Sequence, residues 1–318
     1  SNNSKLKIRM IPVIDFSSYS LSDVSSPPSD EDLAPLADEV YKAFSEVGVI
    51  YLKNHGFDLS LVDDYMKISK KFFNLPKDVK EKFSYDKEAG YMYHGYHHLQ
   101  EHTSHDATVP DLKEAYNTYP QWKGEWPDEY VPGFKEQGLN IIKPCIELNN
   151  RILQTVALGL KWPRDTLTKL HSTDRPSHNC MRTLYYYPVP EGYKLQPGQT
   201  RLGKHTDTGS FTLIFQDDVG GLEIKNVSGE WVPATPLPGA ILVIIGHATQ
   251  CWTVDKLKAT EHRVGVPDGD VNIAAGRQSV IFFGNPDNDA MLGSIEGTKY
   301  QATRYDEYTA DFLYDIQK

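Results

Sequence analysis

The chain has 318 residues, of which 39% are hydrophobic and 24% charged, and its formal net charge is -10. These values fit a globular protein with one large core, and the acidic balance disfavours nucleic acid or an anionic membrane as a partner. Three widely spaced cysteines and the lack of a long apolar stretch argue against a disulfide framework, a signal core and a membrane span, so we expect a cytoplasmic protein.

In the first half of the chain, apolar residues recur at steps of three and four, which is the spacing of amphipathic helices. The first pattern follows Ser29, a residue type that favours a helix start. Pro144 lies inside the fourth pattern and marks either its true start or a kink. We expect these helices to pack their apolar stripes against a sheet. Their expected ranges are about 30–47, 59–73, 76–83 and 138–160.

Short β-rich runs separated by Gly and Pro turns dominate from Asn179 to Phe283. Their spacing predicts a mainly β fold with flanking helices, in which two packed sheets form a jelly-roll whose mouth can hold a cofactor. A last helix over about 303–316 either covers this opening or simply packs, through Tyr305, Tyr308, Phe312, Leu313 and Tyr314. We expect one domain over 1–318, with a largely helical region (about 1–175), a jelly-roll core (about 176–290) and a C-terminal helix (about 291–318).

A candidate metal site lies in the segment that contains His205 and Asp207. Residues i and i+2 of a strand project to the same face, so both side chains can reach one ion while Thr206 points away. His262 follows Asp207 by 55 positions and must come from another strand. Two imidazoles and one carboxylate occupy one face of an octahedral ion and leave positions free, as in iron(II) oxygenases, although the same set also suits zinc.

Downstream, Arg277 and Ser279 share one face of a strand-like apolar run that ends at Phe283. A planar guanidinium beside a hydroxyl suits bidentate binding of a carboxylate. Because an arginine on a buried strand is costly unless it is paired, a bound anion is a reasonable partner for Arg277.

Several further segments occur in an order that is typical of one enzyme family. They are Ile11–Phe16, Gly48–Gly56, Asp111–Glu114, His205–Ile224, Gly229–Val232, Pro238–Ala240 and Cys251–Thr253. By these motifs the chain resembles, almost from end to end, the 2-oxoglutarate and iron(II)-dependent dioxygenases of the isopenicillin N synthase-like group. The resemblance implies a double-stranded β-helix in which His205, Asp207 and His262 bind Fe(II). It also implies that Arg277 and Ser279 hold the distal carboxylate of the co-substrate 2-oxoglutarate, with dioxygen as the second co-substrate.

The sequence departs from the family pattern at two places after His205 and Asp207. His247 stands where the family usually has Asp, and it is either a fourth ligand or a residue that supports or packs beside the site. We do not count His247 among the metal ligands. The segment Pro267–Asp270 is an inserted turn that should lengthen a hairpin without moving the strand faces.

The strand before the first ligand carries three consecutive tyrosines. Period-two alternation divides it into one set with Thr183, Tyr185 and Tyr187 and another with Arg182, Leu184 and Tyr186. We expect the first set to face inward, where the resemblance implies that Tyr187 touches 2-oxoglutarate. Alternatively, the tyrosines are simply strand formers that fill the core.

The substrate pocket is the least defined part of the sequence. Histidines and tyrosines crowd the segment 90–108, which is a surface loop, a substrate contact or a second metal site. Our candidate substrate residues are Tyr96, His98, Tyr116, Tyr185 and Phe283. The cations Lys113, Arg182 and Lys204 either receive a carboxylate-bearing substrate or are exposed solvated charges.

Together these features predict an oxygenase that acts on a small organic molecule. The resemblance implies oxidation of an unactivated C–H bond by hydroxylation, desaturation or ring closure, with release of succinate and CO2, in specialised metabolism. The alternatives are an oxidase like isopenicillin N synthase, which needs no 2-oxoglutarate, and a zinc-binding sandwich or zinc hydrolase without redox chemistry. The sequence does not specify an oligomeric state.

Overall fold

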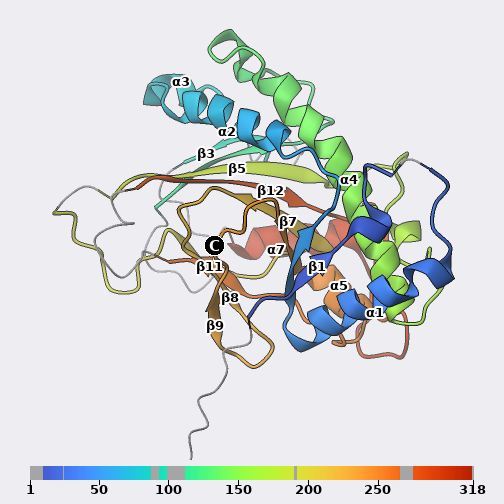
Figure 1. Cartoon of the computed structure of the whole chain (residues 1–318). Coiled ribbons are helices and arrows are strands. Elements are labelled where there is room, and N and C mark those ends of the chain that lie inside the picture. The colour runs from blue at the N-terminus through green and yellow to red at the C-terminus, as the bar shows by residue number, and fades with distance from the viewer. Residues whose placement is uncertain are drawn as a thin grey trace, which may run out of the picture.

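The computed structural model describes residues 10–23, 25–86, 93–98, 112–189, 192–265 and 275–316, with side chains described as far as residue 310. At its centre an eight-stranded sheet packs against a four-stranded sheet. Helices α2 and α4 lie on the opposite side of the larger sheet from strands β8, β9 and β11 (Figure 1). The predicted core of two sheets with flanking helices is therefore confirmed.

Four helices of the first half agree with the sequence patterns to within a few residues. They are α1 (Asp30–Glu46), α2 (Ser60–Phe73), α3 (Lys77–Glu81) and α4 (Phe134–Gly159). A capping box between Ser29 and Asp32 fixes the start of α1, because each side chain accepts a hydrogen bond from the other residue's backbone N–H. Pro144 lies inside α4, so it does not mark the start of that helix. Short 3-10 turns lie at Ser17–Tyr19, Pro127–Glu129 and Thr168–Leu170.

The larger sheet, which we call the major sheet, has the strand order β1-β2-β10-β7-β12-β5-β4-β3. Its only parallel pair is formed by β1 and β2 among the strands that the structure describes. The bounds are β1 Val13–Asp15, β2 Val49–Lys53, β3 Gly95–His97, β4 Glu114–Thr118, β5 Cys180–Tyr186, β7 Phe211–Gln216, β10 Ile241–Ile245 and β12 Arg277–Phe283.

The smaller sheet, the minor sheet, has the order β6-β11-β8-β9 and is antiparallel throughout. Its strands are β6 (Leu202–His205), β8 (Leu222–Lys225), β9 (Trp231–Pro233) and β11 (His262–Val264). The direct pairing of β6 with β11 brings together two segments that are far apart in the sequence. This pairing positions the candidate metal site.

The two faces of the major sheet pack against different parts of the protein. On β5, Met181 and Tyr185 belong to the core cluster that includes the helices, whereas Leu184 and Tyr186 belong to the cluster that includes minor-sheet residues such as Val264. We call these the helix-covered face and the inner face. Both clusters are buried, so the central strands carry apolar residues on both faces of the sheet.

The chain ends with a small hairpin and a helix. The hairpin pairs β13 (Met291–Leu292) with β14 (Thr303–Arg304), α7 spans Tyr305–Ile316, and the short helix α5 covers His247–Trp252. Tyr305 is 1% exposed and donates a hydrogen bond to Asn285 Oδ1 at 2.7 Å. This residue of the predicted last helix therefore packs, while Phe312, Leu313 and Tyr314 lie beyond the described side chains.

None of the helices in the described ranges combines the length and the apolar character that a membrane crossing requires.

Candidate metal centre

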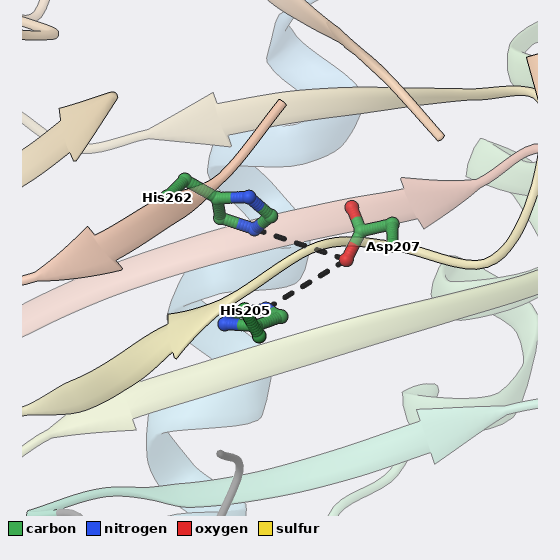
Figure 2. Close-up of side chains that lie close together, drawn as sticks. All are labelled: His205, Asp207 and His262. Atoms are coloured by element: carbon green, nitrogen blue, oxygen red, sulfur yellow. Dashed lines mark ion pairs between the residues drawn. The ribbon is translucent and has the colours of Figure 1, made fainter. Parts of the chain in front are cut away.

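The side chains of His205, Asp207 and His262 converge on one point between two strands of the minor sheet (Figure 2). His205 ends β6 and is the direct cross-strand partner of His262, the first residue of β11. Asp207 Oδ1 lies 3.7 Å from His205 Nε2 and 3.8 Å from His262 Nε2. Ligand atoms at these separations can bind one ion on a single face, as the i and i+2 spacing predicts.

Each of the three side chains is oriented by a hydrogen bond on the atom that points away from the other two. His205 Nδ1 donates to the carbonyl of Gly203 at 2.8 Å, and His262 Nδ1 donates to the carbonyl of Thr260 at 2.9 Å. The hydroxyl of Thr212 donates to Asp207 Oδ2 at 2.6 Å. Both Nε2 atoms and one carboxylate oxygen are thereby presented to the ion, which is the outer support typical of histidine and carboxylate metal sites.

The electrostatics of the site favour an uncharged imidazole at His205. Burial lowers the pKa of His205 to about 3 and His262 lowers it further, while Asp207 and the hydrogen bond to Gly203 raise it by less. A neutral Nε2 keeps the lone pair that a metal needs. Three ligands from one side leave the other side of an octahedral ion open for small molecules, so the arrangement is suited to catalysis rather than to a closed structural site.

Next to this centre, Arg277 and Ser279 lie on the inner face of β12 with donors that lack partners. Arg277 is 1% exposed, and its Nη2 donates a hydrogen bond to Gln216 Oε1 at 3.1 Å. Its Nε and Nη1 atoms and the hydroxyl of Ser279 are buried without a hydrogen-bond partner in the described part of the chain. Buried donors left unsatisfied cost about 1–3 kcal/mol each. A bound anion would provide acceptors for these donors.

A second buried arginine, Arg201, lies at the same end of the inner face and was missed from the sequence. It is fully buried, and its Nη2 donates to the carbonyls of Tyr187 at 3.3 Å and Ala275 at 2.8 Å. Burial lowers its pKa, and so does the nearby charge of Arg277. Its Nε and Nη1 atoms have no partner among the described residues. The only sequence signal was its position four residues before His205.

The expectation that Thr183, Tyr185 and Tyr187 face inward is wrong. Tyr185 stacks on Phe73 of α2 with ring centroids 5.8 Å apart, and its set belongs to the helix-covered face. The Tyr187 ring packs edge-on against Tyr185 at 4.6 Å, and its hydroxyl lies 3.4 Å from Lys80 Nζ. The structure thus places the Tyr187 side chain away from Arg277. Periodicity separated the two sets correctly but could not choose between them, because both sides of this strand are buried.

Three other candidate substrate residues also lie away from the inner face. Tyr116 is fully buried against Phe72 of α2, with centroids 5.2 Å apart. Tyr96, its cross-strand partner on β3, also packs on Phe72, at 5.8 Å. His98 pairs with Glu81 at 2.9 Å near the surface. These residues are structural, since strand alternation turns Tyr96 and Tyr116 toward the helices.

The remaining candidate, Phe283, does lie on the inner face. It packs against the inner cluster and is the cross-strand partner of Thr212, whose hydroxyl holds Asp207. The guanidinium of Arg182 lies 5.3 Å from the centre of its ring. Of the other two cations, Lys113 is buried and Lys204 is exposed.

His247 lies outside the three-residue ligand group. Its ring stacks on Tyr308 of α7 with centroids 5.3 Å apart, and its Nδ1 forms a hydrogen bond with the Tyr308 hydroxyl at 2.8 Å. Its backbone N–H donates to the carbonyl of Asp207 at 2.8 Å. His247 therefore supports the segment that carries Asp207. The inserted turn Pro267–Asp270 and His102 and His105 of the histidine-rich segment fall outside the described residues.

Comparisons with known proteins agree with this geometry. Residues 11–140 match the family model described as non-haem dioxygenase in morphine synthesis N-terminal, and residues 177–286 match that of the 2OG-Fe(II) oxygenase superfamily. The second match contains both strands that carry the three ligand residues.

Individual relatives cover most of the chain. It is 30% identical to the 2-oxoglutarate-Fe(II) type oxidoreductase ppzD of Metarhizium majus, over 81% of this chain and 80% of that protein. It is 32% identical to homoarginine-6-hydroxylase 2-ODD-233 of Oryza sativa subsp. japonica, over 91% and 89% of the two chains. The structure is similar to that of a full-length Neurospora crassa protein in complex with alpha-KG and thymine, with a TM-score of 0.82, 28% identity and coverage of 99% and 98%.

Proposed function

Because the chain belongs to the 2OG-Fe(II) oxygenase superfamily and is an Fe(II)- and 2-oxoglutarate-dependent dioxygenase, we propose that it oxidises an unactivated C–H bond of a small organic molecule. The oxidation is a hydroxylation, a desaturation or a ring closure, and 2-oxoglutarate is converted to succinate and CO2. When bound, the iron and its co-substrates supply the oxidising power for the C–H bond.

The chain's own residues bind and orient the reacting groups. His205, Asp207 and His262 hold the ion, while the hydrogen bonds from Thr212 and to the carbonyls of Gly203 and Thr260 fix their directions. Burial of His262 and of Asp207 limits the access of water to their ligand atoms, whereas His205 is half-buried. Fixed ligand directions matter because the position of the substrate carbon relative to the ion decides which product forms.

Arg277 and Ser279 bind the distal carboxylate of 2-oxoglutarate. The observation that carries this assignment is the set of three buried donor atoms without partners in the described residues, Arg277 Nε, Arg277 Nη1 and Ser279 Oγ. Gln216 accepts a hydrogen bond from the remaining Nη2, so the guanidinium keeps a fixed direction for an ionic contact with a carboxylate. Arg201 adds a second buried guanidinium at this end, which further favours an anion.

A small-molecule substrate agrees with what the relatives act on. The Oryza relative is a homoarginine hydroxylase, and the Neurospora structure contains thymine. Homoarginine and thymine are both small molecules, and the acidic charge of the present chain disfavours a polyanionic partner.

The test is anaerobic titration of 2-oxoglutarate into the iron-loaded protein, followed by succinate release under air. Replacing Arg277→Gln is expected to weaken 2-oxoglutarate binding by at least about tenfold, through loss of a bidentate ionic contact. A matched control is Arg263→Gln, since Arg263 is a half-buried arginine of β11 that pairs with Glu223 instead. Unchanged 2-oxoglutarate affinity in Arg277→Gln would contradict the assignment.

The same assay separates the alternatives. Oxygen uptake that does not depend on 2-oxoglutarate would indicate an oxidase, and hydrolysis supported by zinc would indicate a zinc enzyme.

A further inference from the structure

Arg182 is the one cation of the inner face that lies beside the metal centre on the side away from Arg277, among the described residues. On β12 the inner-face residues run in the order Arg277, Ser279, Ile281 and Phe283. Phe283 comes four positions after Ser279 on this strand, which corresponds to a distance of about 13 Å. The proposed co-substrate anchor and the Arg182 guanidinium, which lies over Phe283, are therefore at opposite ends of the same face.

The position of Arg182 relative to the ion follows from the strand register. Thr212, which holds Asp207 through its hydroxyl, is the cross-strand partner of Phe283. Phe283 is in turn 5.3 Å from the Arg182 guanidinium carbon. Arg182 therefore faces the space next to the ligand residues.

The guanidinium is held in place but only partly used. Its Nε donates to Asn117 Oδ1 at 2.7 Å, and the Asn117 side chain is itself 1% exposed. Arg182 has no carboxylate within ion-pair distance in the described part of the chain. The Nη1 and Nη2 atoms thus remain as a planar fork with a fixed orientation, which suits bidentate binding of a carboxylate.

Charge balance points in the same direction. Asp207 and the two carboxylates of 2-oxoglutarate offset a ferrous ion and one arginine, so the charges of Arg201 and Arg182 both exceed this balance, and that of Arg182 lies next to the apolar ring of Phe283. A partly desolvated charge without a partner is unfavourable, and a bound anion relieves it.

We propose that Arg182, fixed by Asn117 and lying over Phe283, binds a carboxylate of the substrate and so selects small carboxylic acids. Phe283 contacts the carbon skeleton next to that carboxylate, and the C–H bond that reacts lies between Arg182 and the ion. This inference rests on the proposed function, because it places the substrate opposite the 2-oxoglutarate anchor. The inferred site binds one carboxylate of a small molecule, so it does not require nucleic acid or another large polyanion as ligand.

The test compares matched acids and amides as ligands under anaerobic conditions, with Fe(II) and 2-oxoglutarate present. The probes are proline, benzoate and indole-3-acetate, each with its amide, and thymine as a neutral ring with carbonyl acceptors. Calorimetry of the wild type is expected to show at least one acid bound about tenfold or more tightly than its amide. Arg182→Gln should reduce this preference to about twofold or less, and Arg182→Lys should restore part of it.

Arg151→Gln is the matched control, because Arg151 is also a half-buried arginine over an aromatic ring, Tyr19, but lies on α4. It should keep the acid preference of the wild type. The proposal is overturned if Arg182→Gln keeps that preference, if no acid binds better than its amide, or if thymine binds better than every acid. In each sample 2-oxoglutarate is titrated separately: normal 2-oxoglutarate binding without acid preference refutes only this inference, whereas failure to bind 2-oxoglutarate refutes the proposed function.

Discussion

The two faces of the major sheet both bury charged side chains, but these charged groups have different partners on the two faces. On the helix-covered face, Lys80 Nζ lies 2.9 Å from Glu114 Oε1 and also donates to the carbonyl of Phe73 at 3.0 Å. The hydroxyl of Tyr96 donates to the same carboxylate. On the inner face, Nε and Nη1 of Arg277 and the hydroxyl of Ser279 have no partner in the described residues.

This difference distinguishes a structural polar cluster from a ligand site. A buried ion pair with all its hydrogen bonds made contributes to one packed state, and removing one partner is costly. Buried donors without partners lower stability instead, and they persist where a ligand satisfies them. The helix-covered face should therefore report on folding, and the inner face on binding.

Removal of a metal ligand should have the largest effect on the inner face. Asp207→Ala deletes the only carboxylate of the ligand group, so both iron binding and succinate release should fall to background. Iron content after anaerobic loading and desalting measures the first, and the thermal unfolding midpoint without metal checks that the variant folds. Iron retention at the wild-type level would contradict the assignment of this ligand.

On the helix-covered face, Lys80→Met should lower the free energy of unfolding by about 3–5 kcal/mol, because it leaves Glu114 charged and buried. Urea unfolding measures this loss, and 2-oxoglutarate affinity should stay unchanged. The double variant Lys80→Met with Glu114→Gln should recover part of the stability.

By contrast, Arg277→Gln should change stability by less than about 1 kcal/mol, since it breaks no ion pair. Reversal of these two patterns would refute the distinction between the faces.

A smaller effect is expected from the residue that orients Asp207. Thr212→Val removes the 2.6 Å hydrogen bond to Asp207 Oδ2 without a large change in volume, and should weaken iron binding by about 10–100-fold. Competition with a chelator gives the affinity. Thr212→Ser keeps the hydroxyl and serves as the control. Equal iron affinity in the valine and serine variants would show that this hydrogen bond does not orient the ligand.

The last prediction concerns acid stability and involves a histidine outside the metal ligand group. Burial lowers the pKa of His171 from 6.5 to about 4. Between these values the unfolded chain binds a proton that the folded chain does not, so stability is complete above pH 6.5 and falls as the pH drops toward 4. The slope is at most about 1.4 kcal/mol per pH unit.

His171→Gln removes this proton uptake. The difference in unfolding free energy between wild type and variant should therefore change with pH across this window and level off above it. A difference that is constant from neutral pH to pH 4 would contradict the role of His171.

The metal site could be predicted from the sequence because its geometry follows from local rules. His205 and Asp207 are two residues apart at the end of a strand, and the pairing of β6 with β11 supplies His262. The anchor residues Arg277 and Ser279 could be located in the same way, by alternation along one strand.

The orientation of β5 could not be predicted, because both of its faces are buried and apolar side chains alternate on each. Tyr185 and Tyr186 are equally good strand formers, and only the packing of α2 on one side decides between them. Arg201 was also missed, since its surroundings of Gly, Gln and Pro resemble an exposed loop, and burial comes from contacts with Tyr187 and Ala275. Such tertiary contacts leave no periodic signal.

Anomalous diffraction from crystals soaked anaerobically with ferrous salt and 2-oxoglutarate tests the central claim most directly. We predict one iron peak bound by His205 Nε2, Asp207 Oδ1 and His262 Nε2, with the far carboxylate of the keto acid on Arg277 and Ser279. An absent peak, a peak elsewhere, or a keto acid that leaves Arg277 unpaired would contradict it.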